Sequence, residues 1–230
     1  FRAGGPGAGE IPDEADILED LTLLDSAGYN LIRLFGVDEI SGAEKILQIA
    51  AANFSEMRFQ QGLFLEGLAP GPAQQNCESE FNDEQVAEAI RLANTYSNIV
   101  TVSVGNETSF FSGVMPVNCL AGYISETRAK VTQPVTADDD YTFYAGISTP
   151  PDAILPLIDF AAIHMYPITN YRLWDWKQEA VASGPLRAEA MMDEASAVAR
   201  ANYQAVYDYE YQDGSGLTVT IGESMPIVVG

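Results

Sequence analysis

The hydrophobic positions alternate along the chain between helical spacing and short apolar runs typical of buried strands. Ile17, Leu21 and Leu24 keep helical spacing before Gly28, and an apolar strand follows at 30–36. The same alternation predicts helices near 43–51, 82–93, 117–130, 152–157 and 186–207, and strands at 57–65, 99–105, 134–138, 160–166 and 217–223. Asn82 is expected to cap its helix. Repeated strand–helix units indicate an α/β fold, a parallel sheet wrapped by helices.

Two architectures fit this alternation, a (β/α)8 barrel and an open doubly wound sheet. No strand is followed by a G-x-G-x-x-G or P-loop phosphate cradle, which favours the barrel. Six strands are legible, so we expect a barrel that is incomplete at its first and eighth strands. No linker composition or internal repeat divides the chain, and a single catalytic domain over 1–230 is predicted.

The composition limits the partners. Thirty-three acidic and eleven basic residues give a formal net charge of −22 in 230 residues. This charge repels nucleic acid and anionic membranes but not a neutral ligand, and it is typical of a saline or marine setting. No stretch approaches the roughly 20 apolar residues of a membrane span. We expect a secreted, extracellular monomer whose leader peptide has been removed.

The scarce residues exclude whole mechanisms. His164 is the only histidine, and Cys77 and Cys119 are the only cysteines, so a three-histidine or four-cysteine zinc site cannot form. The three lysines fall in helical or loop segments rather than at strand ends, where a barrel places a Schiff-base lysine. We therefore expect no cofactor and no metal, and chemistry carried by carboxylates.

Acidic residues stand at the ends of three predicted strands, where barrel active sites lie. Glu107 follows "VTVSVGN", Asp138–Asp140 follow "PVTA", and Glu223 follows "TVTIG". Two carboxylates that face one cavity can hydrolyse a glycosidic bond, one as a proton donor and one as a nucleophile. An acid after a strand can equally cap a helix or face solvent, so the pair matters more than either glutamate alone.

The segments "SVGNE" at 103–107 and "IGES" at 221–224 resemble the acid/base and nucleophile motifs of glycoside hydrolase family 17, a clan A family of retaining β-1,3-glucanases that includes bacterial laminarinases. Similar segments at 17–38, 134–144 and 159–167 extend the resemblance over most of the chain. It implies that Glu107 ends the fourth barrel strand as general acid/base, that Glu223 ends the seventh as nucleophile, and that Asn106 contacts the sugar. The first strand is then expected before Phe1 and the eighth after Gly230.

One departure from the family concerns the nucleophile segment. The family usually has Gly-Trp after the Glu-Thr or Glu-Ser pair, whereas Met225 and Pro226 follow Glu223 and Ser224 here. The missing tryptophan removes an aromatic wall of the expected subsite.

Further residues are candidates for contacts with the sugar. Sugar rings pack on aromatic side chains, and several aromatics follow the predicted strands. The substrate-binding candidates are Arg33, Asn106, Asp139, Tyr141, Phe143, His164, Tyr166 and Trp174. The alternatives are ordinary loop packing for the aromatics, a hydrogen-bonded core position for His164, and calcium or magnesium ligation for the aspartates. Arg33 is a buried charge expected to pair near Glu107 or Glu223.

Cys77 and Cys119 fall in the loops after the third and fourth strands, which are neighbours on a barrel rim. A disulfide between them is geometrically possible and suits a secreted enzyme, and a Cα separation beyond about 7 Å would exclude it.

The leading functional hypothesis is an endo-acting retaining hydrolase of β-1,3-glucan. A glucanosyltransferase of the same fold would let an acceptor sugar intercept the glycosyl-enzyme. Two hypotheses from other classes are a non-catalytic glucan-binding protein and a magnesium enzyme that uses Glu107, Asp139 and Glu223 as ligands.

Overall fold

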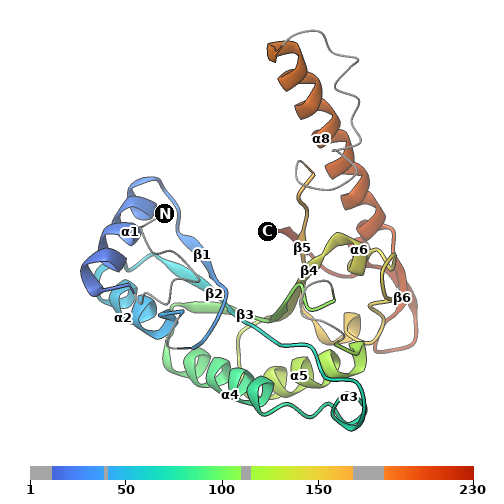
Figure 1. The fold of residues 1–230 in the computed structure, drawn as a ribbon, viewed down its shortest axis with the longest axis horizontal. Helices are drawn as coiled ribbons and strands as arrows, with labels where there is room; N and C mark the ends of the chain where they lie inside the picture. The colour runs from blue at the N-terminus through green and yellow to red at the C-terminus, as the bar shows by residue number, and fades with distance from the viewer. Residues whose placement is uncertain (1–11, 39–40, 110–114, 168–183) are drawn as a thin grey trace.

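The chain forms an α/β fold around one curled parallel sheet. The computed structural model describes residues 12–38, 41–109, 115–167 and 184–230 (Figure 1). The sheet has the strand order β1-β2-β3-β4-β5-β8, and every neighbouring pair is parallel. Its strands are β1 (Leu31–Leu34), β2 (Arg58–Leu63), β3 (Ile99–Asn106), β4 (Val135–Asp140), β5 (Ala161–His164) and β8 (Ile227–Val229). This sheet is a partial barrel, and the described residues do not close it into eight strands.

Helices cover one side of the sheet. The long ones are α1 (Glu14–Ser26), α2 (Ala43–Asn53), α4 (Glu80–Thr95) and α5 (Val117–Lys130), and α8 (Gly184–Tyr207) extends away from the sheet (Figure 1). On α4, Val86, Ala89 and Leu92 are buried, which is the apolar stripe of an amphipathic helix. The short elements are α3 (Pro72–Asn76), α6 (Tyr141–Tyr144), η1 (Leu155–Leu157) and α9 (Ile221–Ser224). The predicted parallel sheet wrapped by helices is confirmed.

Two predicted details of the helices are wrong. The side chain of Ser79, rather than that of Asn82, caps α4 by accepting a hydrogen bond from the Asn82 N–H. Asn82 is instead buried, and its Oδ1 accepts from the backbone N–H of Glu66. The helix expected at 152–157 is only the 3-10 turn η1, because Pro156 and the turn before it prevent a longer helix.

The C-terminal segment differs most from the prediction. The predicted strand 217–223 is shorter, since β7 (Thr218–Thr220) pairs antiparallel with β6 (Glu210–Gln212) in a separate two-stranded sheet. Residues 221–224 then form the helical turn α9, whose Ile221 is fully buried. The strand beside β5 is β8, and Ala161 aligns with Ile227. A segment predicted to be a barrel strand is therefore a hairpin strand followed by a turn.

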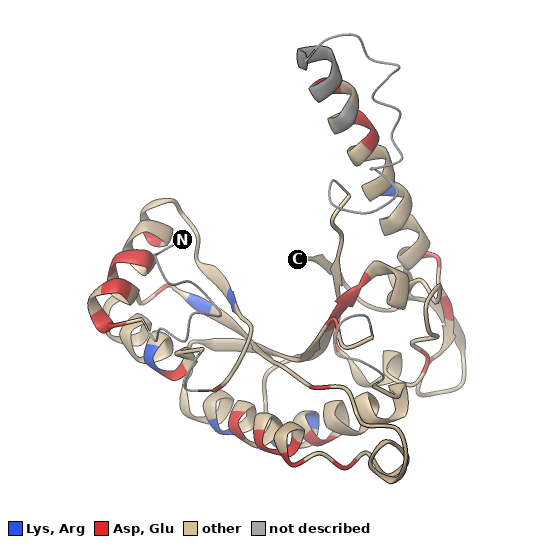
Figure 2. Ribbon diagram, in the orientation of Figure 1, with Lys and Arg blue, Asp and Glu red and all other residues tan. Residues whose placement is uncertain are grey.

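Acidic residues are spread over the helices and the end of β4, while basic ones are few (Figure 2). The core between sheet and helices is apolar and includes Phe59, Leu63, Leu92, Ile124 and Ile163, each almost fully buried. Within the described ranges, no helix is long and apolar enough to cross a membrane.

Candidate active site

Glu107 stands on a sharp turn directly after β3. Gly105 has φ +85° and Glu107 has φ +49°, and a Cβ at Gly105 would collide with the side chain of Thr108. A non-glycine residue in the left-handed region costs about 1–2 kcal/mol and persists where the surroundings hold it. The Glu107 N–H donates to the Asp138 carbonyl at 2.8 Å, which ties the turn to β4.

His164, at the end of β5, contacts the Glu107 carboxylate. Its Nε2 lies 2.6 Å from Nη1 of Arg33 and its Nδ1 lies 2.8 Å from Oε1 of Glu107. Arginine can only donate, so Nε2 is the acceptor. The ring proton must then be on Nδ1, which donates to Glu107. This bond occupies Oε1 and leaves Oε2 without a hydrogen bond from any described residue.

Arg33, on β1, links three strands through its guanidinium. Nη2 donates to Oδ1 of Asn106 at 2.5 Å, and Nε lies 2.7 Å from Oδ2 of Asp138. The guanidinium carbon also lies 4.5 Å above the centre of the Phe35 ring. The expected buried ion pair therefore exists, but its carboxylate is Asp138, and Arg33 reaches Glu107 only through His164.

Asp138 lies at the centre of this network and is 3% exposed. Gln60, on β2, donates from Nε2 to both carboxylate oxygens at 2.9 and 3.1 Å. Burial raises the pKa of Asp138, and the neighbouring Arg33 charge partly offsets this rise. Strands β1 to β5 thus each contribute to one polar cluster, formed by Arg33, Gln60, Asn106, Asp138, His164 and the adjoining Glu107.

Gln60 was not predicted as a site residue. The signal available in the sequence was the polar pair "QQ" inside the apolar strand segment "RFQQGLF", because an amide in a buried strand needs hydrogen-bond partners.

Tyr166 flanks the cluster at the surface. Its ring centroid lies 5.9 Å from that of His164, and the residue is 51% exposed. Partial burial and the nearby Glu107 charge raise the pKa of its hydroxyl. An aromatic ring beside a carboxylate can stack on a sugar ring, and the assignment of Tyr166 as a sugar contact stays a prediction.

Asp139, Tyr141 and Phe143 do not face the surface as expected of sugar contacts. They are 1%, 3% and 0% exposed. Phe143 packs edge-on against Tyr144 within α6, and Asp139 accepts hydrogen bonds from Ser109. Tyr141 and Phe143 belong to the buried core, and Asp139 is buried as well, so this structure does not place any of the three to contact a sugar. Trp174 lies outside the described residues.

Glu223 is not brought beside Glu107. It is exposed on α9, before β8 begins, so it lies toward the amino end of that strand. Gly230, at the carboxyl end of β8, is the residue near the cluster, because a Cβ there would lie 3.3 Å from Cδ2 of His164. The extended stretch from Met225 to Gly230 spans roughly 16 Å at about 3.3 Å per residue. The structure therefore does not place Glu223 at the end of a barrel strand opposite Glu107, and its role as nucleophile stays a prediction.

Cys77 and Cys119 form a disulfide with a Cα–Cα distance of 5.2 Å. The bond joins the segment that follows α3 to the first turn of α5. It fixes the long loop after β2 against the helix that follows the Glu107 turn.

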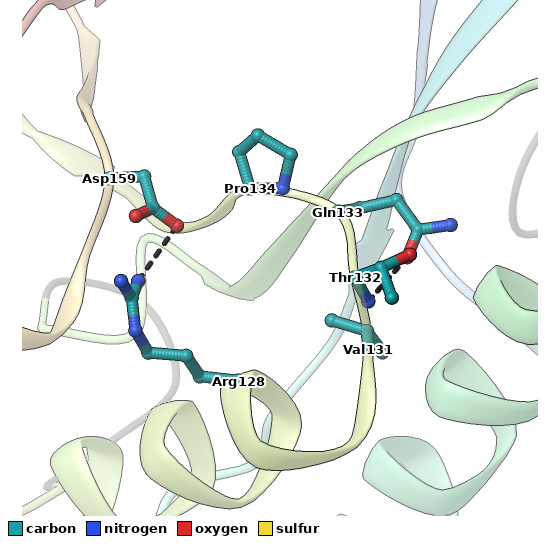
Figure 3. Close-up of a pocket in the computed structure, with 6 residues that line it drawn as sticks. All are labelled: Arg128, Val131, Thr132, Gln133, Pro134 and Asp159. Atoms are coloured by element: carbon teal, nitrogen blue, oxygen red, sulfur yellow. Dashed lines mark hydrogen bonds and ion pairs between the residues drawn. The ribbon is translucent and has the colours of Figure 1, made fainter.

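A hollow of about 350 Å³ lies at the opposite end of the sheet (Figure 3). It is bordered by the loop before β4 and by the ion pair of Arg128 with Asp159, 2.7 Å apart. Arg128 and Asp159 are paired with each other, and Asp159 is the one acid among the described residues that border the hollow, so the two carboxylates of a glycosidase are not found there. In the described part of the chain, no group of three or more acidic, histidine or cysteine side chains is placed to hold a metal.

The curled parallel sheet with polar side chains at its carboxyl ends is a partial (β/α) barrel, and solved glycosidases contain the same fold. The chain superposes on Lactobacillus rhamnosus β-glucuronidase with a TM-score of 0.56 and 17% identity, covering 97% of this chain and 33% of that one. A β-galacturonidase of glycoside hydrolase family 2 from Eisenbergiella tayi gives a TM-score of 0.52 and 17% identity, over 96% and 32% of the two chains.

Among sequence relatives, the cell surface mannoprotein MP65 of Candida albicans is 30% identical over 148 residues. The match covers 62% of this chain and 34% of the mannoprotein, so the chain spans about a third of the relative's length. No family model matches the chain.

Proposed function

We propose that this protein hydrolyses β-1,3-linked glucan with retention of configuration, and that Glu107 is its general acid/base. The observation that carries the proposal is the position of Glu107. It stands at the carboxyl end of β3, and one carboxyl oxygen is held by His164 while the other has no partner among the described residues. The resemblance to glycoside hydrolase family 17 supplies the substrate and the stereochemistry.

In this mechanism the Glu107 carboxyl protonates the glycosidic oxygen as the bond to the anomeric carbon breaks. A carboxylate nucleophile forms the glycosyl-enzyme on the opposite face of the sugar. Glu107, now ionised, then removes a proton from water, and the hydroxyl attacks the anomeric carbon. His164 and Arg33 orient Glu107 through both steps, and in this proposal Asn106, which accepts a hydrogen bond from Arg33, contacts the sugar.

The charges around Glu107 support a neutral sugar. The solved neighbours named above act on uronic acids, whose carboxylate needs a cation. All three guanidinium nitrogens of Arg33 are engaged with Asp138, His164 and Asn106. Of the other described basic residues, Arg91 lies on α4 and Arg128 on α5, away from this edge of the sheet. Within the described residues, a uronate at this site would meet acidic groups and no available cation.

The nucleophile is a separate part of the proposal. The family resemblance assigns it to Glu223, whereas in this structure residues 218–220 pair with β6 and β8 lies beside β5. An eight-stranded barrel, likewise part of the proposal, would have its seventh strand beside β5. The two glutamates are therefore tested separately.

The test is the release of reducing sugar from laminarin by the wild type and three variants. Glu107→Gln and Glu223→Gln should each lower kcat by roughly 100-fold or more, while Glu126→Gln, on the exposed face of α5, should leave it unchanged. Full activity of Glu107→Gln would remove the proposed function. Full activity of Glu223→Gln alone would assign the nucleophile to another carboxylate and leave Glu107 in place.

A second function is favoured by the separation of Glu223 from Glu107. A sugar-binding site with one carboxylate would bind glucan without hydrolysing it. Retarded migration in laminarin-containing gels, with no reducing sugar released by the wild type, would single out this binding protein.

We also propose an extracellular location. The Cys77–Cys119 disulfide suits an oxidising compartment, and the sequence relative is a cell-surface protein. The wild type recovered from the culture medium with no free thiol would agree with this location.

A further inference from the structure

Asp139 is a buried carboxylate that the proposed mechanism does not use. It follows Asp138 on β4, and because successive side chains of a strand point to opposite faces, it faces away from the polar cluster. It is 1% exposed and lies beside the fully buried Tyr144 of α6. Within the described ranges it makes no ion pair, so a charge-bearing group is held there by neutral donors alone.

Those donors come mainly from the Glu107 turn. Ser109 donates its hydroxyl to Oδ1 of Asp139 at 2.5 Å and its backbone N–H to Oδ2 at 3.0 Å. The Asp140 N–H adds a third bond, to Oδ1, at 2.8 Å. Burial raises the pKa of Asp139 to about 6, while these bonds act against the rise.

The turn is consequently fastened to β4 on both sides of Glu107. Upstream, the Glu107 N–H donates to the Asp138 carbonyl; downstream, Ser109 is fixed by the Asp139 side chain. Between these two attachments Glu107 holds φ +49°, a conformation that a free turn would abandon. The strained residue is the one whose carboxyl meets His164.

We propose that Asp139 is a positioning residue, which clamps Ser109 so that the Glu107 carboxyl stays against Nδ1 of His164. The clamp acts through the backbone and does not touch the substrate. The catalytic meaning of this inference rests on the proposed acid/base role of Glu107. The positioning of Glu107 by Asp139 can be tested without that role.

His164 allows the geometry to be read without an activity assay. It is the only histidine of the chain, so the imidazole signals in an NMR spectrum of histidine-labelled protein belong to one residue. Its Nδ1 proton is buried and bonded to Glu107, and we expect a slowly exchanging signal. Glu107→Ala, which removes the acceptor, is the reference for a lost bond.

The variants are Asp139→Ala and Ser109→Ala, with Asp159→Asn as the matched control. Asp159 also accepts from the backbone of β4, at the Val135 N–H, but at the far end of the strand. In Asp139→Ala the Nδ1 proton signal should weaken or exchange as in Glu107→Ala. Ser109→Ala keeps the backbone bond, so its effect should be smaller, and Asp159→Asn should resemble the wild type.

Kinetics with aryl β-laminaribiosides supply the second readout. A misplaced acid matters only when the leaving group needs a proton. For Asp139→Ala, kcat/KM should fall roughly 10- to 100-fold with weakly acidic phenols and by less than about threefold with dinitrophenol. An unchanged Nδ1 signal, or a loss of the same size for every leaving group, would overturn the clamp.

If Asp139→Ala does not fold, Ser109→Ala, at a partly exposed position, decides by the same two measurements. A wild type that cleaves no glycoside would end the proposed function alone, because the histidine signal still reports whether Asp139 positions Glu107.

Discussion

Removing Arg33 tests whether the polar cluster holds the sheet together as well as the site. Arg33→Met keeps most of the side-chain volume and deletes the partner of Asp138, which is 3% exposed and lies 2.7 Å from Nε. Breaking a buried ion pair costs about 3–5 kcal/mol because the remaining charge is uncompensated. The Arg33 side chain is 19% exposed and Gln60 still bonds Asp138, so we expect the lower end, about 3 kcal/mol.

The pH dependence follows from Asp138. Burial already raises its pKa above that of an unfolded chain, so its contribution to stability is largest in acid and is lost as the pH rises. Without Arg33 the pKa of Asp138 rises further. The loss in free energy of unfolding caused by Arg33→Met should therefore be smaller at pH 5 than at pH 8.

Urea unfolding followed by circular dichroism measures these differences, with Arg91→Met as the matched control. Arg91 pairs with Glu44 and Glu88 on the surface, where its side chain is 45% exposed, so its loss should cost less than about 1 kcal/mol. The double variant Arg33→Met/Asp138→Asn should cost clearly less than the sum of the two single changes. A deficit of Arg33→Met no larger than that of Arg91→Met, or strict additivity in the double variant, would refute the buried pair.

Three further predictions concern single features of the fold. The double variant Cys77→Ser/Cys119→Ser should lose about 4 kcal/mol in urea unfolding, since the bond closes a loop with a sequence separation of 42 residues; an unchanged midpoint would contradict this. Burial raises the pKa of Asp139 to about 6 from 3.8, so the stability that its protonated form contributes is fully present below pH 4 and is lost as the pH rises through 6. Relative to the wild type, the free energy of unfolding of Asp139→Asn should therefore increase by about 3 kcal/mol between pH 4 and pH 8. The opposite slope would show that the carboxylate is stabilised in the fold. Gly105→Ala should lower Tm by the equivalent of about 1–3 kcal/mol, because φ is +85° and the new methyl group meets Thr108, while Gly122→Ala, with open space around it, should not.

The strands around the site were predictable because each is a short apolar run that ends at polar or glycine residues. Strands β1, β2 and β5 lie within the predicted apolar runs, and β3 and β4 extend one and two residues past the predicted ends. Their parallel pairing follows from the helices between them. Local pattern was sufficient here because no second segment competed for the same place in the sheet.

The C-terminal strand shows where local pattern fails. Both 218–221 and 227–229 are apolar, β-branched runs, and each is suited to lie beside β5. The structure pairs the first run with β6 and buries Ile221 against the helical layer, where Gly222 lets α9 approach the ring of Tyr207 closely. These contacts are between segments distant in sequence, so periodicity could not choose between the two runs.

Both Glu107 and His164 were candidate site residues from the sequence, and the structure brings them together at one edge of the sheet. Their contact, and the residues that support it, were not predicted. The aromatics Tyr141 and Phe143 also follow a strand, yet they turn inward as part of α6. The sequence distinguishes an inward from an outward turn only by the tertiary partners, and the Ser109–Asp139 clamp is hidden for the same reason.

The polar cluster separates the orientation of the proposed acid, Glu107, from the identity of the nucleophile, which the family resemblance treats together. Arg33, Gln60, Asn106, Asp138 and His164 come from β1 to β5, and β8 adds only the backbone of Gly230 beside His164. The orientation of Glu107 therefore depends on five strands whose pairing is continuous, and not on which segment follows β5. Proof that Glu107 donates a proton would say nothing about Glu223, and loss of Glu223 from the mechanism would leave the geometry of the acid intact.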